Sequence, residues 1–334
     1  MKIPRDAGLD LLKAISIIFV LLWHLQPFKF FQESGIISNI FNYLLDIFNI
    51  QVSLTAVPIF IVVSLYLFFA TSNNHNDLKK RLARILQVFI FWSAIQFMFS
   101  YFAIGKIPQP SVKMIMGVAP ELPFVGDSVL YFLFNLFFVT AIAFLFKQAK
   151  AKLQRILSII TIVFYLINFE IISSPGINVF IPYWNLENFI IYIPIAFYLA
   201  KYKEKILKFK KYYLLAYIVF SIQDIYLRYS NYGTSIYARN SIVFGALTIF
   251  CFVYPLEIKN SKYVQLLSKY ALGIYAIHKY WQSLFIILIS HSNNLTNLTL
   301  NLNWLWFCVA VITVIFTFGS VYLLSWTKLR RFVM

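Results

Sequence analysis

The sequence predicts an all-α protein: a bundle of about ten transmembrane helices with both ends of the chain on the cytoplasmic side. Apolar residues make up 61% of the 334 residues, whereas charged residues make up only 12%. About a quarter of the residues of a soluble domain are charged, so much of this chain's surface must face something other than water. Lipid is the simplest answer, and the mean hydropathy of +0.76 agrees with it.

Ten segments are apolar and long enough to be interpreted as spans. A helix needs about 20 mainly apolar residues to cross roughly 30 Å of hydrocarbon. The sixth segment is short and Pro194 interrupts it, which leaves a count of nine open. The ten segments are residues 8–27, 49–71, 85–105, 128–146, 155–173, 187–200, 212–228, 239–255, 270–290 and 303–325.

The positions of lysine and arginine indicate the orientation. Cytoplasmic loops of membrane proteins carry an excess of basic residues. If the N-terminus is inside, most of the 29 Lys and Arg residues lie in cytoplasmic segments. If one of the ten segments did not cross the membrane, the basic loops after it would lie on the external side. The charges therefore favour an even number of spans and two cytoplasmic ends. The abundance of Ile, Asn, Lys and Phe is typical of an AT-rich bacterial genome, and we expect a multi-pass protein of the bacterial cytoplasmic membrane.

The net charge of +17 does not indicate nucleic-acid binding in such a chain. The topology rule and the anionic lipids of the inner surface account for the same excess, so we expect membrane lipids and no nucleic acid as partners. Cys251 and Cys308 lie in apolar runs, and we expect neither a disulfide framework nor a metal site. No loop is long enough to fold separately, which predicts one domain over residues 1–334.

The first span carries three ionisable residues, and such residues are costly inside a membrane. Lys13 and His24 are eleven residues apart, close to three helical turns, so both project from one face with His24 about 16 Å further along the helix. Asp10 and Lys13 are neighbours on that face and can neutralise each other. The alternative is that Asp10 and Lys13 anchor the helix at the interface and that His24 only bonds a neighbouring helix.

Four more polar residues lie on two other spans. Ser64 and Tyr66 in the second span are typical of helix packing. Tyr275 and His278 in the ninth span are three residues apart, so they can share a hydrogen-bond network on one helix face. An interfacial belt is an equally good interpretation of this second pair.

Arg81 and Arg84 precede the third span, beside Lys79 and Lys80 on the predicted cytoplasmic side. The positive-inside rule explains such a run without any ligand. The functional interpretation is that guanidinium groups grip phosphates in a bidentate manner, such as those of a nucleotide-bearing acyl donor.

These segments resemble the acyltransferase-3 family of integral membrane acyltransferases. The likeness is in register from the first span to the ninth, and each motif alone is weak. The motifs are Leu9–Ile15 running on to His24, Val57–Phe68, Arg81–Leu86, and Ser268–His278, which is the nearest match.

The resemblance implies transfer of an acyl group, which we expect to be acetyl, from acyl-coenzyme A to a hydroxyl of a cell-surface glycan or lipid-linked sugar. Acetyl-coenzyme A is then a co-substrate, with no permanently bound cofactor and no metal. His24 is the implied catalytic residue, as general base or as nucleophile. Arg81 and Arg84, with Lys13, would hold the donor's phosphates. The implied supporting or substrate-binding residues are Asp10, Lys13, Ser64, Tyr66, Tyr275 and His278.

Three positions depart from the family pattern and keep other functions open. Lys13 stands where the family usually has Arg, Leu65 replaces Gly, and Val129 begins a segment that often reads His-Leu-Trp-Phe. One alternative is an exporter or transporter of a polysaccharide or lipid-linked intermediate. The other is a non-enzymatic partner of a polysaccharide synthase.

Overall fold

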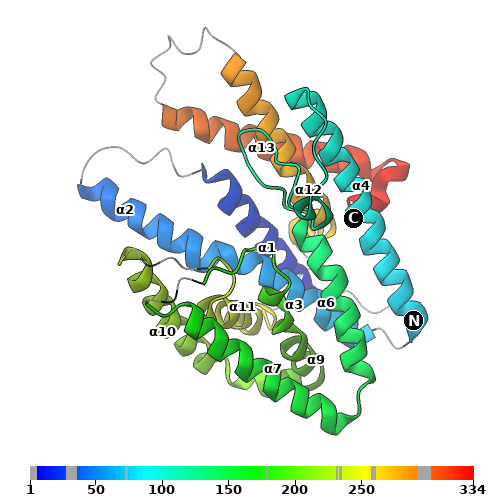
Figure 1. Cartoon of the computed structure of the whole chain (residues 1–334), viewed down its shortest axis with the longest axis vertical. Helices are drawn as coiled ribbons and strands as arrows, with labels where there is room; N and C mark the ends of the chain where they lie inside the picture. The colour runs from blue at the N-terminus through cyan, green and yellow to red at the C-terminus, as the bar shows by residue number, and fades with distance from the viewer. Residues whose placement is uncertain are drawn as a thin grey trace. The chain divides into compact units, whose positions relative to one another are not determined.

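The computed structural model describes residues 6–27, 36–71, 74–175, 177, 179–230, 232, 235–256, 261–291 and 302–334. All the regular secondary-structure elements in these residues are helices (Figure 1). The one addition in the same residues is an isolated β-bridge between Leu122 and Gly126. The predicted all-α class is therefore confirmed. The α-helices are α1 (Ala7–Leu25), α2 (Ile36–Ile47), α3 (Ala56–Thr71), α4 (His75–Ile104), α5 (Val112–Ile115), α6 (Tyr131–Gln148), α7 (Ala151–Ile172), α8 (Glu187–Ile190), α9 (Tyr192–Lys208), α10 (Lys210–Tyr229), α11 (Asn240–Val253), α12 (Lys262–His291) and α13 (Leu302–Ser325).

Three short helices of other types complete the fold in these residues. A π-helical turn at Phe48–Val52 and a 3₁₀ turn at Ser53–Thr55 join α2 to α3, and a 3₁₀ turn at Lys328–Phe332 follows α13. Because α2 runs through these turns into α3, the apolar helix that contains the predicted second span begins before residue 49.

Seven helical stretches in the described residues are long and apolar enough to cross a membrane, so the protein is a membrane protein. They coincide with the first five predicted spans and the last two. The remaining predicted spans fall on shorter or more polar helices, so the count of ten and the cytoplasmic ends stay predictions. The seven stretches are Ala7–Leu25, Asn39–Thr71, His75–Ile104, Tyr131–Gln148, Ala151–Ile172, Lys262–Ser290 and Leu305–Ser325.

The sixth predicted segment is divided, but the break precedes its proline. Helix α8 ends at Ile190, and Ile191 caps the start of α9. Pro194 therefore lies in the first turn of α9, where its missing N–H leaves no helical hydrogen bond unmade. The backbone of α9 bends instead at Tyr202, whose φ and ψ of −130° and 31° are not helical.

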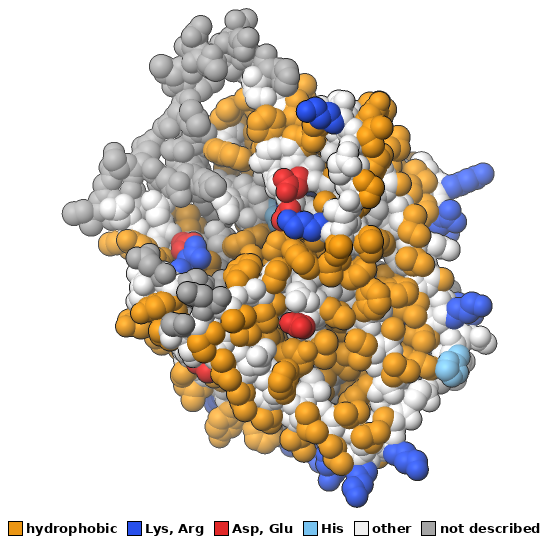
Figure 2. All heavy atoms as spheres, viewed as in Figure 1, with side chains coloured by type: hydrophobic (Ala, Val, Ile, Leu, Met, Phe, Trp, Pro, Cys, Tyr) orange, Lys and Arg blue, Asp and Glu red, His pale blue; other side chains and the backbone are white. Residues whose placement is uncertain are grey.

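Helix α7 shows how the apolar surface is arranged for lipid. Its buried side chains include Ser158, Tyr165 and Phe169, whereas a stripe at helical spacing is exposed. Apolar side chains likewise cover most of the face drawn in Figure 2. Such a large exposed apolar surface is stable against acyl chains and not against water. The exposed stripe of α7 consists of Ile156, Ile159, Ile160, Val163, Phe164, Ile167 and Ile171.

The described residues form two compact units. The first draws on Met1–Phe19, Ile50–Ile85 and Asn135–Ser268, and the second on Val20–Asn49, Leu86–Phe134 and Lys269–Met334. In the first unit, α3 packs against α9 and α11. Leu65 of α3, which stands where the resembling family has glycine, is fully buried there. The prediction of a single domain stays a prediction.

Gly273 allows α12 to pack closely on the end of the chain within the second unit. A Cβ atom at this position would lie 2.8 Å from the Val333 Cβ and 2.9 Å from the Val333 carbonyl oxygen. We expect Gly273→Ala to destabilise the protein by about 1–3 kcal/mol through overpacking, measured as a lower thermal unfolding temperature in detergent. Gly319→Ala is the control, because nothing lies within 4 Å of its Cβ position. The control should gain about 0.5–1 kcal/mol; equal effects of both changes would contradict the packing argument.

Candidate functional site

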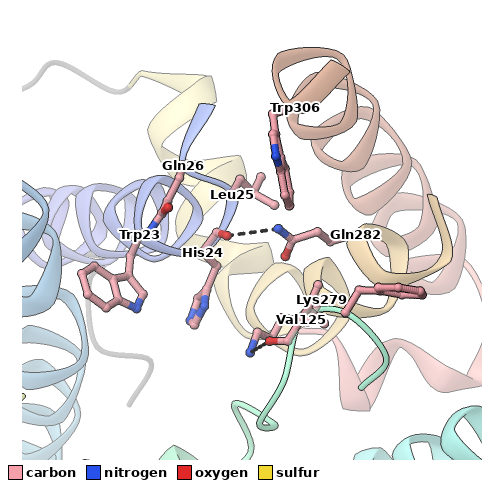
Figure 3. A pocket seen from close by; sticks show the side chains of 9 residues that line it. Trp23, His24, Leu25, Gln26, Val125, Lys279, Gln282 and Trp306 are labelled. Carbon is pink, nitrogen blue, oxygen red and sulfur yellow. Dashed lines mark hydrogen bonds between the residues drawn. The ribbon is translucent and has the colours of Figure 1, made fainter. Parts of the chain in front are cut away.

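The catalytic residue predicted from the sequence, His24, lines a pocket in the second unit. The pocket encloses about 240 Å³ and is formed by the last turn of α1, the loop between α5 and α6, and helices α12 and α13 (Figure 3). His24 is partly buried, so its imidazole combines a low-polarity surrounding with access for a small reacting group. The lining residues are Trp23, His24, Leu25, Gln26, Phe124, Val125, Lys279, Gln282 and Trp306.

The structure brings together three of the predicted site residues in this unit. The ring centroids of His24 and His278 are 5.1 Å apart at an angle of 42°, and those of Tyr275 and His278 are 6.3 Å apart. His278 and Tyr275 are both buried on α12. The sequence placed the last two on one helix face, and the structure adds that this face meets the end of α1.

The tautomer of His278 follows from its hydrogen bond. Its Nδ1 lies 3.1 Å from the backbone oxygen of Ile274. A carbonyl oxygen only accepts, so Nδ1 must carry the proton and Nε2 must be the lone-pair nitrogen of the neutral ring. This Nε2 is buried and has no hydrogen-bond partner within the described residues. A buried acceptor without a partner is costly and indicates a position reserved for a function.

The hydroxyl of Tyr275 is already engaged. It donates to the backbone oxygen of Val129, the position where the chain departs from the family's histidine. Val129 is itself buried, and it accepts this hydrogen bond through its backbone oxygen, since its apolar side chain cannot. The single hydroxyl proton of Tyr275 is therefore unavailable for a bound substrate in this arrangement.

Lys279 lies within the ninth predicted span, and the structure places it in the wall of the pocket. Only 6% of its surface is exposed, and its Nζ donates to the backbone oxygens of Val125, at 3.0 Å, and of Asp127. These bonds fix the loop that forms one side of the pocket. Sequence inspection offered one signal for this residue, its place next to His278.

The remaining pocket residues were also missed. Gln282 lies one helical turn after His278, so helical periodicity alone places it on the same face. Its Nε2 donates to the backbone oxygen of His24 at 3.1 Å, which ties α12 to the end of α1 (Figure 3). Trp306 and Phe124 come from distant segments, and nothing in the sequence connects them with His24.

In the first unit, two predicted residues are in direct contact. The Nη2 of Arg81 donates to the backbone oxygen of Ser64 at 2.7 Å and to its hydroxyl at 2.6 Å. The guanidinium also lies over the ring of Phe68, with 5.5 Å between its central carbon and the ring centroid. Arg81 thus joins the start of α4 to α3, while Arg84 is exposed.

Two further predicted residues of the first unit have identified partners. Asp10 is buried and accepts a hydrogen bond of 2.5 Å from the hydroxyl of Ser268, the first residue of the fourth family-like motif. The ring of Tyr66 lies 6.0 Å from that of Tyr254. Lys13 is partly buried. The structure does not test the pairing of Asp10 with Lys13 or the contact of Lys13 with a donor phosphate, and both stay predictions.

A buried ion pair in the first unit escaped the sequence analysis. Arg239 and Asp224 are almost fully buried, with 3.3 Å between Nη1 and Oδ2, and the hydroxyl of Ser241 also donates to Asp224. The other nitrogens of Arg239 donate to the backbone oxygens of Ile50 and Ile236. With every charge satisfied by the protein, this cluster holds helices together and does not resemble an open site.

Two observations bear on cofactors. In the part of the chain that the structure describes, no three His, Cys, Asp or Glu side chains gather as a metal site would require. The basic residues best suited to bind the phosphates of a nucleotide are Arg81 and Arg84, at the start of α4. The pocket beside His24 suits a ligand that can interact with imidazole, amide and aromatic groups.

Comparison with known proteins gives one finding. A family model described as an acyltransferase domain, that of the acyltransferase-3 family, matches residues 6–326. The searches of curated proteins and of solved structures gave no significant match.

Proposed function

Since this chain belongs to the acyltransferase-3 family, we propose that this membrane acyltransferase moves an acetyl group from acetyl-coenzyme A to a hydroxyl of a cell-surface glycan or lipid-linked sugar. The bacterial cytoplasmic membrane is the proposed location. The observation that carries the proposal is the place of His24, a partly buried imidazole that lines a pocket beside the second histidine, His278. Imidazole suits proton transfer at neutral pH better than any other side chain.

The proposed reaction needs one proton acceptor at the acceptor hydroxyl. As general base, His24 takes the hydroxyl proton while the oxygen attacks the thioester carbonyl carbon. The C–S bond then breaks, and the thiolate of coenzyme A leaves with the proton that the imidazolium returns. As nucleophile, the imidazole nitrogen of His24 instead attacks the thioester carbonyl carbon, the C–S bond breaks and the thiolate of coenzyme A leaves. The acceptor hydroxyl then attacks the acetyl group, the C–N bond to the imidazole breaks, and the hydroxyl proton passes to the thiolate.

His278 is proposed as a positioning residue for His24. With its proton on Nδ1, its Nε2 is an acceptor, and its ring lies beside that of His24, with 5.1 Å between the ring centroids. An acceptor at this place favours one orientation of the His24 ring, as the orienting groups of other catalytic histidines do. The alternative role in stabilising an oxyanion needs a proton donor, and neither the neutral His278 nor the engaged Tyr275 hydroxyl offers one.

The donor's phosphates are proposed to bind at Lys13, Arg81 and Arg84. Arg81 uses one nitrogen on Ser64, so its other nitrogens are the candidates for phosphate oxygens. Asp10, Ser64 and Tyr66 are proposed to support this group. The support for this part of the proposal is the family resemblance together with the placement of Ser64 and Arg81 in contact.

The experiment that tests the proposal uses purified protein in liposomes with radiolabelled acetyl-coenzyme A and lipid-linked sugars from a bacterial membrane. We expect label in the sugar fraction and release of free coenzyme A in equal amounts. Movement of sugar across the liposome membrane without acetyl-coenzyme A would support the exporter instead. Co-purification with a polysaccharide synthase, without any transfer of label, would support the non-enzymatic partner.

A further inference from the structure

In the side-chain amide of Gln282, the nitrogen has a hydrogen-bond partner, whereas the oxygen has none within the described residues. Its amide nitrogen must be the atom that faces the His24 backbone oxygen, because two carbonyl oxygens would repel each other. This fixes the direction of the remaining oxygen, Oε1. Only 4% of the residue is exposed, and Oε1 has no hydrogen-bond partner within the described residues.

The unpaired Oε1 is costly unless a ligand supplies a donor. Leaving a buried acceptor unsatisfied costs about 1–3 kcal/mol, which close-packed proteins avoid outside functional sites. Gln282 lines the same pocket as His24. Since its nitrogen lies 3.1 Å from the His24 backbone oxygen, a hydroxyl bound to Oε1 lies beside the catalytic residue.

The pocket walls suit a ring that has both hydroxyl groups and an apolar face. Trp306 reaches from α13 toward Gln282 (Figure 3), and Phe124 and Trp23 also line the pocket. The C–H face of a sugar ring packs on aromatic surfaces, while its hydroxyls hydrogen-bond to polar groups around it. Two loop carbonyls bind two of the three N–H donors of Lys279 and hold its ammonium group against the pocket wall.

We propose that Gln282 Oε1 accepts a hydrogen bond from a second hydroxyl of the acceptor, next to the hydroxyl that His24 activates. The acceptor must then be a polyol such as a sugar and not a simple alcohol. This inference rests on the proposed function and deepens it, because it names the residue that selects the substrate class.

The test compares two acceptor probes that differ in their hydroxyl groups. Octyl β-D-glucopyranoside presents a sugar ring, and tetraethylene glycol monooctyl ether presents one terminal hydroxyl on a similar tail. For the wild-type protein in liposomes, with radiolabelled acetyl-coenzyme A, we expect kcat/KM for the glucoside to exceed that for the ether at least tenfold. Gln282→Met also loses the bond to the His24 backbone oxygen, so kcat/KM should fall for both probes, but for the glucoside by about tenfold more than for the ether.

Two further variants separate binding from structure. Gln282→Glu keeps an acceptor oxygen but loses the N–H that binds the His24 backbone oxygen, so it should lose rate toward both probes while retaining more of the preference for the glucoside than Gln282→Met does. Gln96→Met is the matched control, because this buried amide has both partners, the backbone oxygen of Pro120 and the hydroxyl of Tyr280. Any loss in the control should affect the two probes equally.

The outcomes distinguish the inference from the function on which it rests. Equal loss of activity toward both probes in Gln282→Met would overturn the inference and leave a structural role for Gln282. Equal use of the two probes by the wild-type protein would overturn it as well, with acyl transfer itself intact. Failure of the wild-type protein to acetylate either probe or any lipid-linked sugar would refute the proposed function, and the inference with it.

Discussion

Replacing His24 with alanine is expected to lower the rate of acetyl transfer by about 10²–10⁴-fold, the usual contribution of a general base. A nucleophilic histidine predicts a loss at least as large, because no covalent intermediate then forms. His24 is only partly buried at the last turn of α1, so the truncation removes little packing. The amount of protein in the membrane should therefore stay unchanged.

The measurement is transfer of label from acetyl-coenzyme A to lipid-linked sugar by equal amounts of each variant in liposomes. His75→Ala is the matched control, since His75 is exposed at the start of α4 and contacts only the ring of Phe144 among the interactions identified for it. If His24→Ala still transfers the acetyl group, His24 is not the catalytic residue. To detect a covalent intermediate, the protein is incubated with labelled acetyl-coenzyme A without acceptor and then denatured rapidly. Label that stays on the wild-type protein and is missing from His24→Ala would identify the nucleophilic route.

The part of the site that lies along single helices could be predicted from the sequence. Helical periodicity put Tyr275 and His278 on one face, and the cost of an ionisable group in a membrane drew attention to His24. The same reasoning found the apolar stretches that form the seven long helices. Both signals are local, so a single sequence is enough to carry them.

The part of the site that depends on tertiary packing could not be predicted. The place of Lys279 in the pocket wall could not be predicted, because the sequence does not show that a loop offers it two carbonyl oxygens. Trp306 and Phe124 reach the pocket from segments far apart in the chain. Arg239 and Asp224 were likewise assigned to separate spans, and only the packing of α10 on α11 explains why two charges are tolerated there.

Removal of the charge of Arg239 is expected to destabilise the first unit strongly. In Arg239→Met, the buried carboxylate of Asp224 keeps the hydroxyl of Ser241 but loses its counter-ion, and breaking a buried pair from one side costs about 3–5 kcal/mol. The side-chain bonds to the backbone oxygens of Ile50 and Ile236 are lost as well. The thermal unfolding temperature in detergent should fall clearly below that of the wild type.

The double variant Arg239→Met, Asp224→Leu separates the pair from the packing around it. Two apolar side chains leave no unpaired charge, so much of the lost stability should return. Arg155→Met is the control, because Arg155 is exposed and its charge is solvated; its unfolding temperature should match the wild type. If the double variant is as unstable as Arg239→Met, the hydrogen bonds of Arg239 to the backbone, and not its charge pairing, hold these helices together.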